Sequence, residues 1–242
     1  MGKEILGLGA EKNLNSLEEQ GKKLKDPDFG GGMGGSALQL PGLEGLQYFA
    51  TQPSTQTAVA GSTAVLPCRI INKVGHLQWT KDGFALGTER DLFGFSRYTM
   101  IGSDDEGDFS LRIHPVLLED DGFYQCQVSA LDGIPGIRSP LARLTVYMPP
   151  EPPVITPAVV KTTAGITVNL QCISRGGRPP PEANDRTRET IRDGVLVTTE
   201  KMADGKRVTV ASRLPFTPER PHHNSTITCL TSNQALTSPS SV

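Results

Sequence analysis

From Gln47 onward, apolar and polar residues alternate with a period of two along short segments. Successive side chains of a β-strand point to opposite faces, so this pattern predicts strands with one buried face and one solvated face. Gly, Asp, Asn and Pro separate the segments, which is typical of an antiparallel sandwich. The apolar positions are Ala64, Leu66, Cys68 and Ile70; Phe109, Leu111 and Ile113; Tyr124, Cys126 and Val128; Ala142, Leu144 and Val146; Ile166, Val168, Leu170 and Cys172; Val208 and Val210; Ile227 and Cys229.

Two cysteines, a tryptophan and a tyrosine add a more specific pattern to this alternation. Trp79 follows Cys68 by eleven residues, and Tyr124 precedes Cys126 by two. An immunoglobulin sandwich combines a bridge between two facing sheets, an indole packed against it and a tyrosine two residues before the second cysteine. We therefore expect an immunoglobulin-like domain with Trp79 and Tyr124 in its core.

The four cysteines can pair in three ways, and their order favours one bridge in each half of the chain. Cys68 and Cys126 are 58 residues apart, and Cys172 and Cys229 are 57 apart. Such bridges persist in an oxidising compartment, so they indicate an extracellular protein. The chain has no C-x-x-C pair, which a structural zinc site would need. The net charge of -2 indicates no nucleic-acid partner.

Composition and turn residues divide the chain into four parts. Residues 1–46 hold 11 of the 26 glycines and little apolar surface, so we expect a disordered segment. Residues 47–148 form the first immunoglobulin-like domain, of variable or intermediate type. Residues 149–157 lie in a proline-rich linker that favours extended conformation. Residues 158–242 form a second, constant-type domain. The expected fold class is thus all-β, with two tandem immunoglobulin-like sandwiches.

The second domain departs from the pattern of the first. No tryptophan follows Cys172, Ile227 stands where the corner tyrosine is expected, and only 13 residues follow Cys229. Most of the last strand is therefore missing from the sequence. We expect a destabilised domain with an exposed edge beside the strand that carries Cys229.

Four stretches make the resemblance more specific: LQWTKDGFALG, RYTMIGSDDEGDFSLRI, LLEDDGFYQCQVS and GIRSPLARLTVYMPPEPPVI. They resemble the first domain of the roughest and kin-of-irre adhesion receptors, a group that includes irregular chiasm and nephrin-like proteins. CISRGGRPPPE and HHNSTITC resemble that family's second domain, although residues 182–185 lack its tryptophan. The resemblance covers about residues 47–235. It implies a receptor whose members bind one another, homophilically or heterophilically, between cells through their first domains.

A candidate partner-binding face follows from the alternation. If Trp79 and Cys126 point inward, the residues between the apolar positions point to the other side of the same sheet. They are Gln78, Thr80, Gln125, Gln127, Ser129, Arg143 and Thr145. Glutamine donates and accepts hydrogen bonds, which suits a face that pairs with a copy of itself. The family resemblance additionally implies that Gln78 and Phe84 lie at the contact. The alternative is a solvated face with Phe84 folded into the core.

Other polar motifs have structural interpretations. Arg97 and Asp120 are spaced like the ion pair found below the tyrosine corner of many immunoglobulin domains. Residues 103–108, SDDEGD, lack the spacing of a calcium loop and are expected at a charged hairpin tip. His222 and His223 would point to opposite faces of a strand, so we expect no metal site. No combination of nucleophile, base and orienting acid is present, and we expect neither an enzyme nor a cofactor.

Asn224 begins an N-x-[ST] glycosylation triplet, consistent with an extracellular protein. The chain shows no signal peptide and no membrane span, so we expect the extracellular part of a plasma-membrane receptor for cell–cell adhesion. One alternative is a soluble secreted ligand or decoy. Another is an intracellular structural immunoglobulin module with reduced thiols. No small-molecule substrate is expected.

Overall fold

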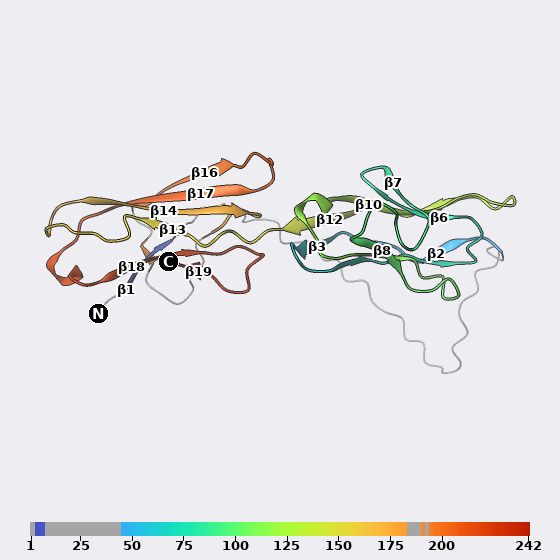
Figure 1. Cartoon of the computed structure of the whole chain (residues 1–242), viewed down its shortest axis with the longest axis horizontal. Coiled ribbons are helices and arrows are strands. Elements are labelled where there is room, and N and C mark those ends of the chain that lie inside the picture. Colours follow the sequence, from blue (N-terminus) through green and yellow to red (C-terminus); the bar gives the residue numbers. More distant parts are fainter. Residues whose placement is uncertain (1–2, 8–44, 183–189, 192–193) are drawn as a thin grey trace, which may run out of the picture.

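The computed structural model describes residues 3–7, 45–182, 190–191 and 194–242, which form two β-sandwiches arranged end to end (Figure 1). The prediction of an all-β chain with two tandem immunoglobulin domains is confirmed. Most of the expected Gly-rich segment, residues 8–44, lies outside the described residues.

One sheet of the first domain carries the candidate face. Its strand order is β3-β12-β10-β6-β7, and β11 also pairs with β10. The bounds are β3 Gln56–Val59, β6 Leu77–Lys81, β7 Phe84–Gly87, β10 Gly122–Val128, β11 Ile137–Arg138 and β12 Ala142–Tyr147. The facing layer holds the sheet β4-β9-β8 and the pair β2-β5. Its bounds are β2 Tyr48–Thr51, β4 Ala64–Leu66, β5 Arg69–Ile71, β8 Tyr98–Ile101 and β9 Ser110–Ile113.

The core of the first domain surrounds the bridge between Cys68 and Cys126. Their Cα atoms are 6.5 Å apart, and both residues are fully buried. Trp79 is Cys126's partner in the β6–β10 ladder, and its Nε1 donates to the Phe109 carbonyl oxygen at 2.8 Å. The only polar atom of the buried indole is thereby satisfied. A bridge that closes a loop of this length stabilises the domain by roughly 4 kcal/mol in the chain-entropy model.

The second domain has a four-stranded sheet of order β13-β14-β17-β16. Its bounds are β13 Val154–Thr156, β14 Val168–Gly177, β16 Leu196–Lys201 and β17 Val208–Phe216. The other sheet has the order β15-β1-β18-β19. Its bounds are β1 Lys3–Gly7, β15 Thr190–Ile191, β18 Thr226–Thr231 and β19 Ser240–Ser241. A short 3-10 helix, η2, lies at Arg220–His222 of this domain, and another, η1, lies at Leu118–Asp120 between β9 and β10 of the first domain.

Strand β1 corrects one expectation, because residues 1–46 were expected to form no packed structure. Lys3–Gly7 instead forms a strand paired along its length with β18. The composition of the whole segment is glycine-rich and polar, and this average concealed the short apolar stretch Ile5-Leu6.

The core of the second domain is smaller than that of the first. Among the described residues, five are buried in its hydrophobic cluster, against twenty in the first domain. The five are Leu170, Cys172, Val210, Leu214 and Cys229. Cys172 and Cys229 form the second predicted bridge, with Cα atoms 6.2 Å apart. Ile166, expected in the strand of Cys172, precedes β14 and is 57% exposed.

The edge of β18 opposite β1 is only partly covered. Strand β19 pairs with Leu230 and Thr231, and Val242 exchanges two backbone hydrogen bonds with Cys229. Beyond these residues, a groove of about 940 Å³ opens between residues 157–164 and the start of β18.

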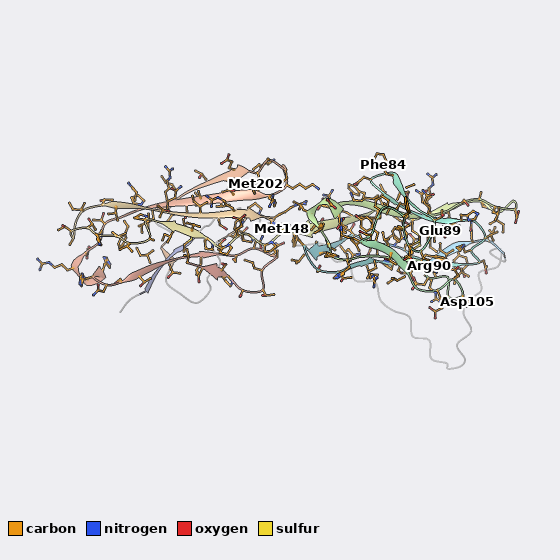
Figure 2. All side chains as sticks on the ribbon, viewed as in Figure 1. Phe84, Glu89, Arg90, Asp105, Met148 and Met202 are labelled. Atoms are coloured by element: carbon orange, nitrogen blue, oxygen red, sulfur yellow. A yellow bond between two sulfur atoms is a disulfide. The ribbon has the colours of Figure 1, made fainter. Side chains whose placement is uncertain are left out.

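The linker is anchored where the two domains meet. Met148 and Arg178 exchange backbone hydrogen bonds of 2.7 and 2.9 Å, and Asn233 Nδ2 donates to the Met148 carbonyl oxygen at 2.8 Å. Arg178 Nη1 lies 2.8 Å from Asp121 Oδ2 of the first domain, at ion-pair distance but without hydrogen-bond geometry. Figure 2 shows Met148 at this junction. These contacts restrict the angle between the domains.

No helix in the described part of the chain combines the length and the apolar character required to cross a bilayer.

The difference in core size predicts two unfolding transitions. We expect the second domain to melt at a lower temperature than the first, since buried apolar area is the main source of folding free energy. Trp79 is the only tryptophan of the chain and lies in the first domain, so its fluorescence reports on that domain alone. Far-ultraviolet circular dichroism reports on both. The dichroism signal should begin to change at a lower temperature than the fluorescence, and coincident curves would contradict this expectation.

Candidate functional site

The outer face of the sheet β12-β10-β6-β7 carries the residues that the alternation predicted. In β10 and β12 every second side chain is buried, with the others more accessible. Gln127 is the ladder partner of Gln78, and Phe123 is the partner of Arg143. These pairs bring side chains from three strands onto one continuous surface. We call the surface formed by Gln78, Gln125, Gln127 and Arg143, together with Phe84 at the margin of the same sheet, the front face.

Thr80 does not belong to the accessible front face. It lies on the expected side of β6, but only 6% of it is exposed. Its ladder partners are Gln125 on one side and Ala85 on the other. A short side chain on a central strand is readily covered by longer neighbours. Alternation predicts the direction of a side chain and not how much of it reaches solvent.

The glutamines of the front face are held by specific hydrogen bonds. Gln125 Nε2 donates to the Ser139 carbonyl oxygen at 2.6 Å, and Gln127 Nε2 donates to Gln125 Oε1 at 2.7 Å. Ser139 Oγ in turn accepts a hydrogen bond from the Cys126 backbone N–H at 3.1 Å. The two amides are therefore oriented before any partner binds, which lowers the entropic cost of docking.

Phe84 is the most exposed side chain of the front face. It is 79% exposed, so it is not folded into the core. It pairs with Lys81 across the β6–β7 ladder, and Lys81 in turn lies opposite the buried Tyr124. Phe84 therefore lies at the margin of the sheet, and Figure 2 shows it at the outside of the domain. Phe93 is fully exposed in the segment after β7. Sequence reasoning missed Phe93, because it lies in an irregular segment where no periodicity marks its direction.

Arg97, directly before β8, and Asp120 of η1 form a two-point ion pair. Arg97 Nη2 donates to Asp120 Oδ1 at 2.8 Å, while Nη1 contacts Oδ2. The fully buried carboxylate also accepts from the Leu117 backbone N–H and the Tyr98 hydroxyl. Tyr124 donates its hydroxyl to the Asp120 carbonyl oxygen at 2.8 Å, which completes the tyrosine corner. The role of this pair is structural.

Burial by itself would raise the pKa of Asp120, but the hydrogen bonds from Arg97, Leu117 and Tyr98 outweigh it and lower the pKa below 3.8. Burial, followed by the hydrogen bond to Asp120, raises the pKa of Tyr98 to about 12. The hydrogen bond to the Asp120 carboxylate raises the pKa of Arg97. The ion pair is therefore fully charged at neutral pH.

The acidic run 103–108 lies in the connection between β8 and β9. Asp104 is paired with Arg90, and Asp108 accepts hydrogen bonds from the backbone N–H and hydroxyl of Ser110. His222 stacks on Phe216 with ring centroids 5.3 Å apart. Within the described ranges, no three His, Cys, Asp or Glu side chains lie close enough to hold a metal ion.

Both domains match models of known immunoglobulin domain families. Residues 48–129 match the model of an immunoglobulin domain, and residues 153–240 match the CD80-like C2-set immunoglobulin domain. The crystal structure of Rst D1-D2 superposes with a TM-score of 0.73 at 46% sequence identity, covering 81% of this chain and 96% of that one. The chain belongs to the irregular chiasm C-roughest and kin-of-IRRE-like family.

Relatives in this family are found in insects and vertebrates. The Irregular chiasm C-roughest protein of Drosophila melanogaster is 49% identical over 193 residues, which cover 78% of this chain and 25% of the relative. Kin of IRRE-like protein 1 of Homo sapiens is 38% identical over 191 residues, with coverages of 78% and 25%. The chain thus spans about a quarter of the length of these family members.

The lowered pKa of Asp120 predicts acid sensitivity. The folded state stabilises the ionised carboxylate of Asp120 more than the unfolded state does. This carboxylate therefore contributes fully to the free energy of unfolding when the pH is above the ordinary pKa of 3.8. The contribution is lost as the pH falls below that value. At pH 7, Asp120→Asn should lower the free energy of unfolding of the first domain by about 3 kcal/mol, since it leaves Arg97 without a charged partner.

Urea unfolding followed by Trp79 fluorescence at pH 7 and pH 3 measures both effects. The Asp120→Asn protein should lose less stability between these pH values than the unchanged protein. Asp105→Asn, at an exposed position of the β8–β9 connection, serves as the matched control and should behave like the unchanged protein. Equal pH dependence of all three proteins would contradict the assignment.

The glycosylation triplet lies in an accessible loop. Asn224 is exposed between η2 and β18 and has a positive φ of 61°, a conformation that asparagine tolerates. Expression in a secretory eukaryotic host should therefore add one N-linked glycan, removable by an N-glycosidase with the corresponding mass change. Asn224→Gln should lack this change, and a chain without any glycan in that host would contradict the prediction.

Proposed function

We propose that this chain is the adhesive part of a cell-surface receptor for cell–cell recognition. The front face of the first domain docks on the same receptor, or on a related immunoglobulin receptor, of an opposing cell. The observation that carries the proposal is the 79% exposure of Phe84 on β7, in the same sheet as glutamines that are already oriented. Family membership and the two bridges support an extracellular site of action.

The chemistry of the front face suits contact with a similar face. In a two-fold interface the same patch occurs on both partners, so each group must be compatible with its own kind. An amide provides a donor and an acceptor together, whereas like charges would repel. Gln78, Gln125 and Gln127 meet this requirement. Arg143 lies at the side of the patch, with its guanidinium 4.9 Å from the ring of Phe123 and an ion pair to Asp121.

Phe84 has the properties of an interface anchor. Burying an aromatic side chain removes roughly 150–250 Å² from water. Anchors of this kind contribute most when polar neighbours exclude water around them. A standard interface buries about 800 Å² on each partner, so Phe84 would supply a substantial part of the contact.

The test replaces residues of the front face and leaves the fold intact. Phe84→Asp replaces the exposed aromatic anchor by a charge and should weaken association by at least about 2 kcal/mol, or about 30-fold. Gln78→Ala removes a polar contact and should have a smaller effect in the same direction. Analytical ultracentrifugation and aggregation of coated beads measure the association.

Val65→Asp is the matched control, because Val65 is a 40% exposed apolar residue on β4 of the facing layer. It should leave association unchanged. Trp79 fluorescence checks that each variant is folded. Undiminished association of both the Phe84→Asp and Gln78→Ala proteins would rule out the front face. Equal loss in the Val65→Asp protein would do the same.

A further inference from the structure

Among the described strands of the second domain, none that lies between β14 and β17 in the chain pairs directly with β18, whereas β6 pairs with β10 in the first domain. In the first domain, β6 lies between β7 and β10 and runs antiparallel to β10. Trp79 on β6 is the ladder partner of Cys126. In the second domain, the sequence after Cys172 contains no tryptophan. The equivalent place beside β18 is taken by β1, which comes from the other end of the chain.

The register of β1 on β18 resembles the register of β6 on β10. Five consecutive pairs join β1 and β18, from Lys3 with Thr226 to Gly7 with Leu230. Leu6 pairs with Cys229, as Trp79 pairs with Cys126 in the first domain. The direction differs, because β1 runs parallel to β18. A strand from a distant part of the chain can adopt either direction, whereas a hairpin neighbour must be antiparallel.

Strand β1 is a central strand and not an edge. Its second neighbour is β15, with Ile5 paired to Thr190 and Leu6 to Ile191. Figure 1 shows β1 beside β18 in the second domain, whereas the first domain begins at β2, in the other sandwich. Without β1, nothing would join β15 to β18, and the backbone groups of β18 on that side would lose their partners.

The connection to the first domain is long enough for this pairing. Residues 8–46 separate β1 from the predicted start of the first domain. An extended chain of that length spans up to roughly 130 Å, several times the ~30 Å diameter of a small domain. A tethered strand also has an effective concentration on the order of millimolar, which favours pairing within one molecule.

We propose that Lys3–Gly7 is a donor strand that binds the β18 edge of the second domain of the same molecule. Among the described strands, it holds the position beside β18 that β6 holds beside β10, and it joins β18 to β15. Residues 3–7 therefore bind the second domain of the chain to which they belong. This inference does not depend on the front face or on its partner.

Hydrogen–deuterium exchange of the whole chain tests the proposal directly. In the unchanged protein, the backbone N–H groups of Ile5, Leu6 and β18 should exchange at least tenfold more slowly than those of an unstructured peptide. Ile5→Pro removes a ladder donor from a central strand. It should raise the exchange rates of β18 at least tenfold and leave those of β10 in the first domain unchanged. Leu14→Pro introduces the same residue outside β1 and should have no effect.

Unprotected N–H groups of Ile5 and Leu6 in the unchanged protein would overturn the proposal without any variant. So would β18 rates that do not respond to Ile5→Pro. Sedimentation of the unchanged and Ile5→Pro proteins at one concentration separates pairing within one molecule from pairing between two. Slow exchange in β1 together with an association state that Ile5→Pro leaves unchanged supports the proposal, whether or not the front face associates. A dimer that Ile5→Pro dissociates would show that a second copy supplies the strand, and would overturn pairing within one molecule.

Discussion

The pairing of Trp79 with Cys126 in the ladder of β6 and β10 is the constraint on which the first domain depends. The indole and the bridge to Cys68 belong to one fully buried cluster that joins the two layers. A strand that slipped by one residue would turn every side chain to the opposite face. Burial of Trp79 and Cys126 therefore fixes Gln78, Gln125 and Gln127 on the outside. The front face is thus a consequence of core packing as much as of its own residues.

Much of the first domain could be predicted from the sequence, because strong local patterns agree with the fold. The alternation of apolar and polar residues around Cys68 and Tyr124 predicted the strands there. The position of Tyr124 two residues before Cys126 predicted the tyrosine corner. Accessibility was harder to predict. Thr80 has the right direction but is covered, and the exposure of Phe93 has no periodic signal. These properties depend on the size and position of neighbours from other strands, which a single strand's pattern does not contain.

The second domain shows where local patterns stop being sufficient. Strand β14 follows the expected alternation from Val168 onward, and the bridge from Cys172 to Cys229 is in place. The strand beside β18 could not be predicted, because its residues lie more than two hundred positions away in the sequence. A five-residue segment in a glycine-rich region carries too little signal to be recognised as a strand. Its pairing becomes favourable only when β18 and β15 already present unpaired backbone groups on both sides.

Two adjacent acids link the front face to the second domain. Asp120 points into the core, where Arg97 and Tyr98 hold it. Asp121 accepts from Arg143 at 3.0 Å and lies 2.8 Å from Arg178 of the second domain. Only 6% of the Asp121 side chain is exposed, so solvent screens these two contacts less than it would screen a surface pair. Because the Asp120 network fixes the backbone from which Asp121 extends, the tyrosine corner also orients the junction. A partner that displaced Arg143 would leave Asp121 with Arg178 and with the Val146 backbone N–H, which donates to Asp121 Oδ2 at 3.0 Å. Arg143 on the front face and Arg178 at the junction therefore share one carboxylate.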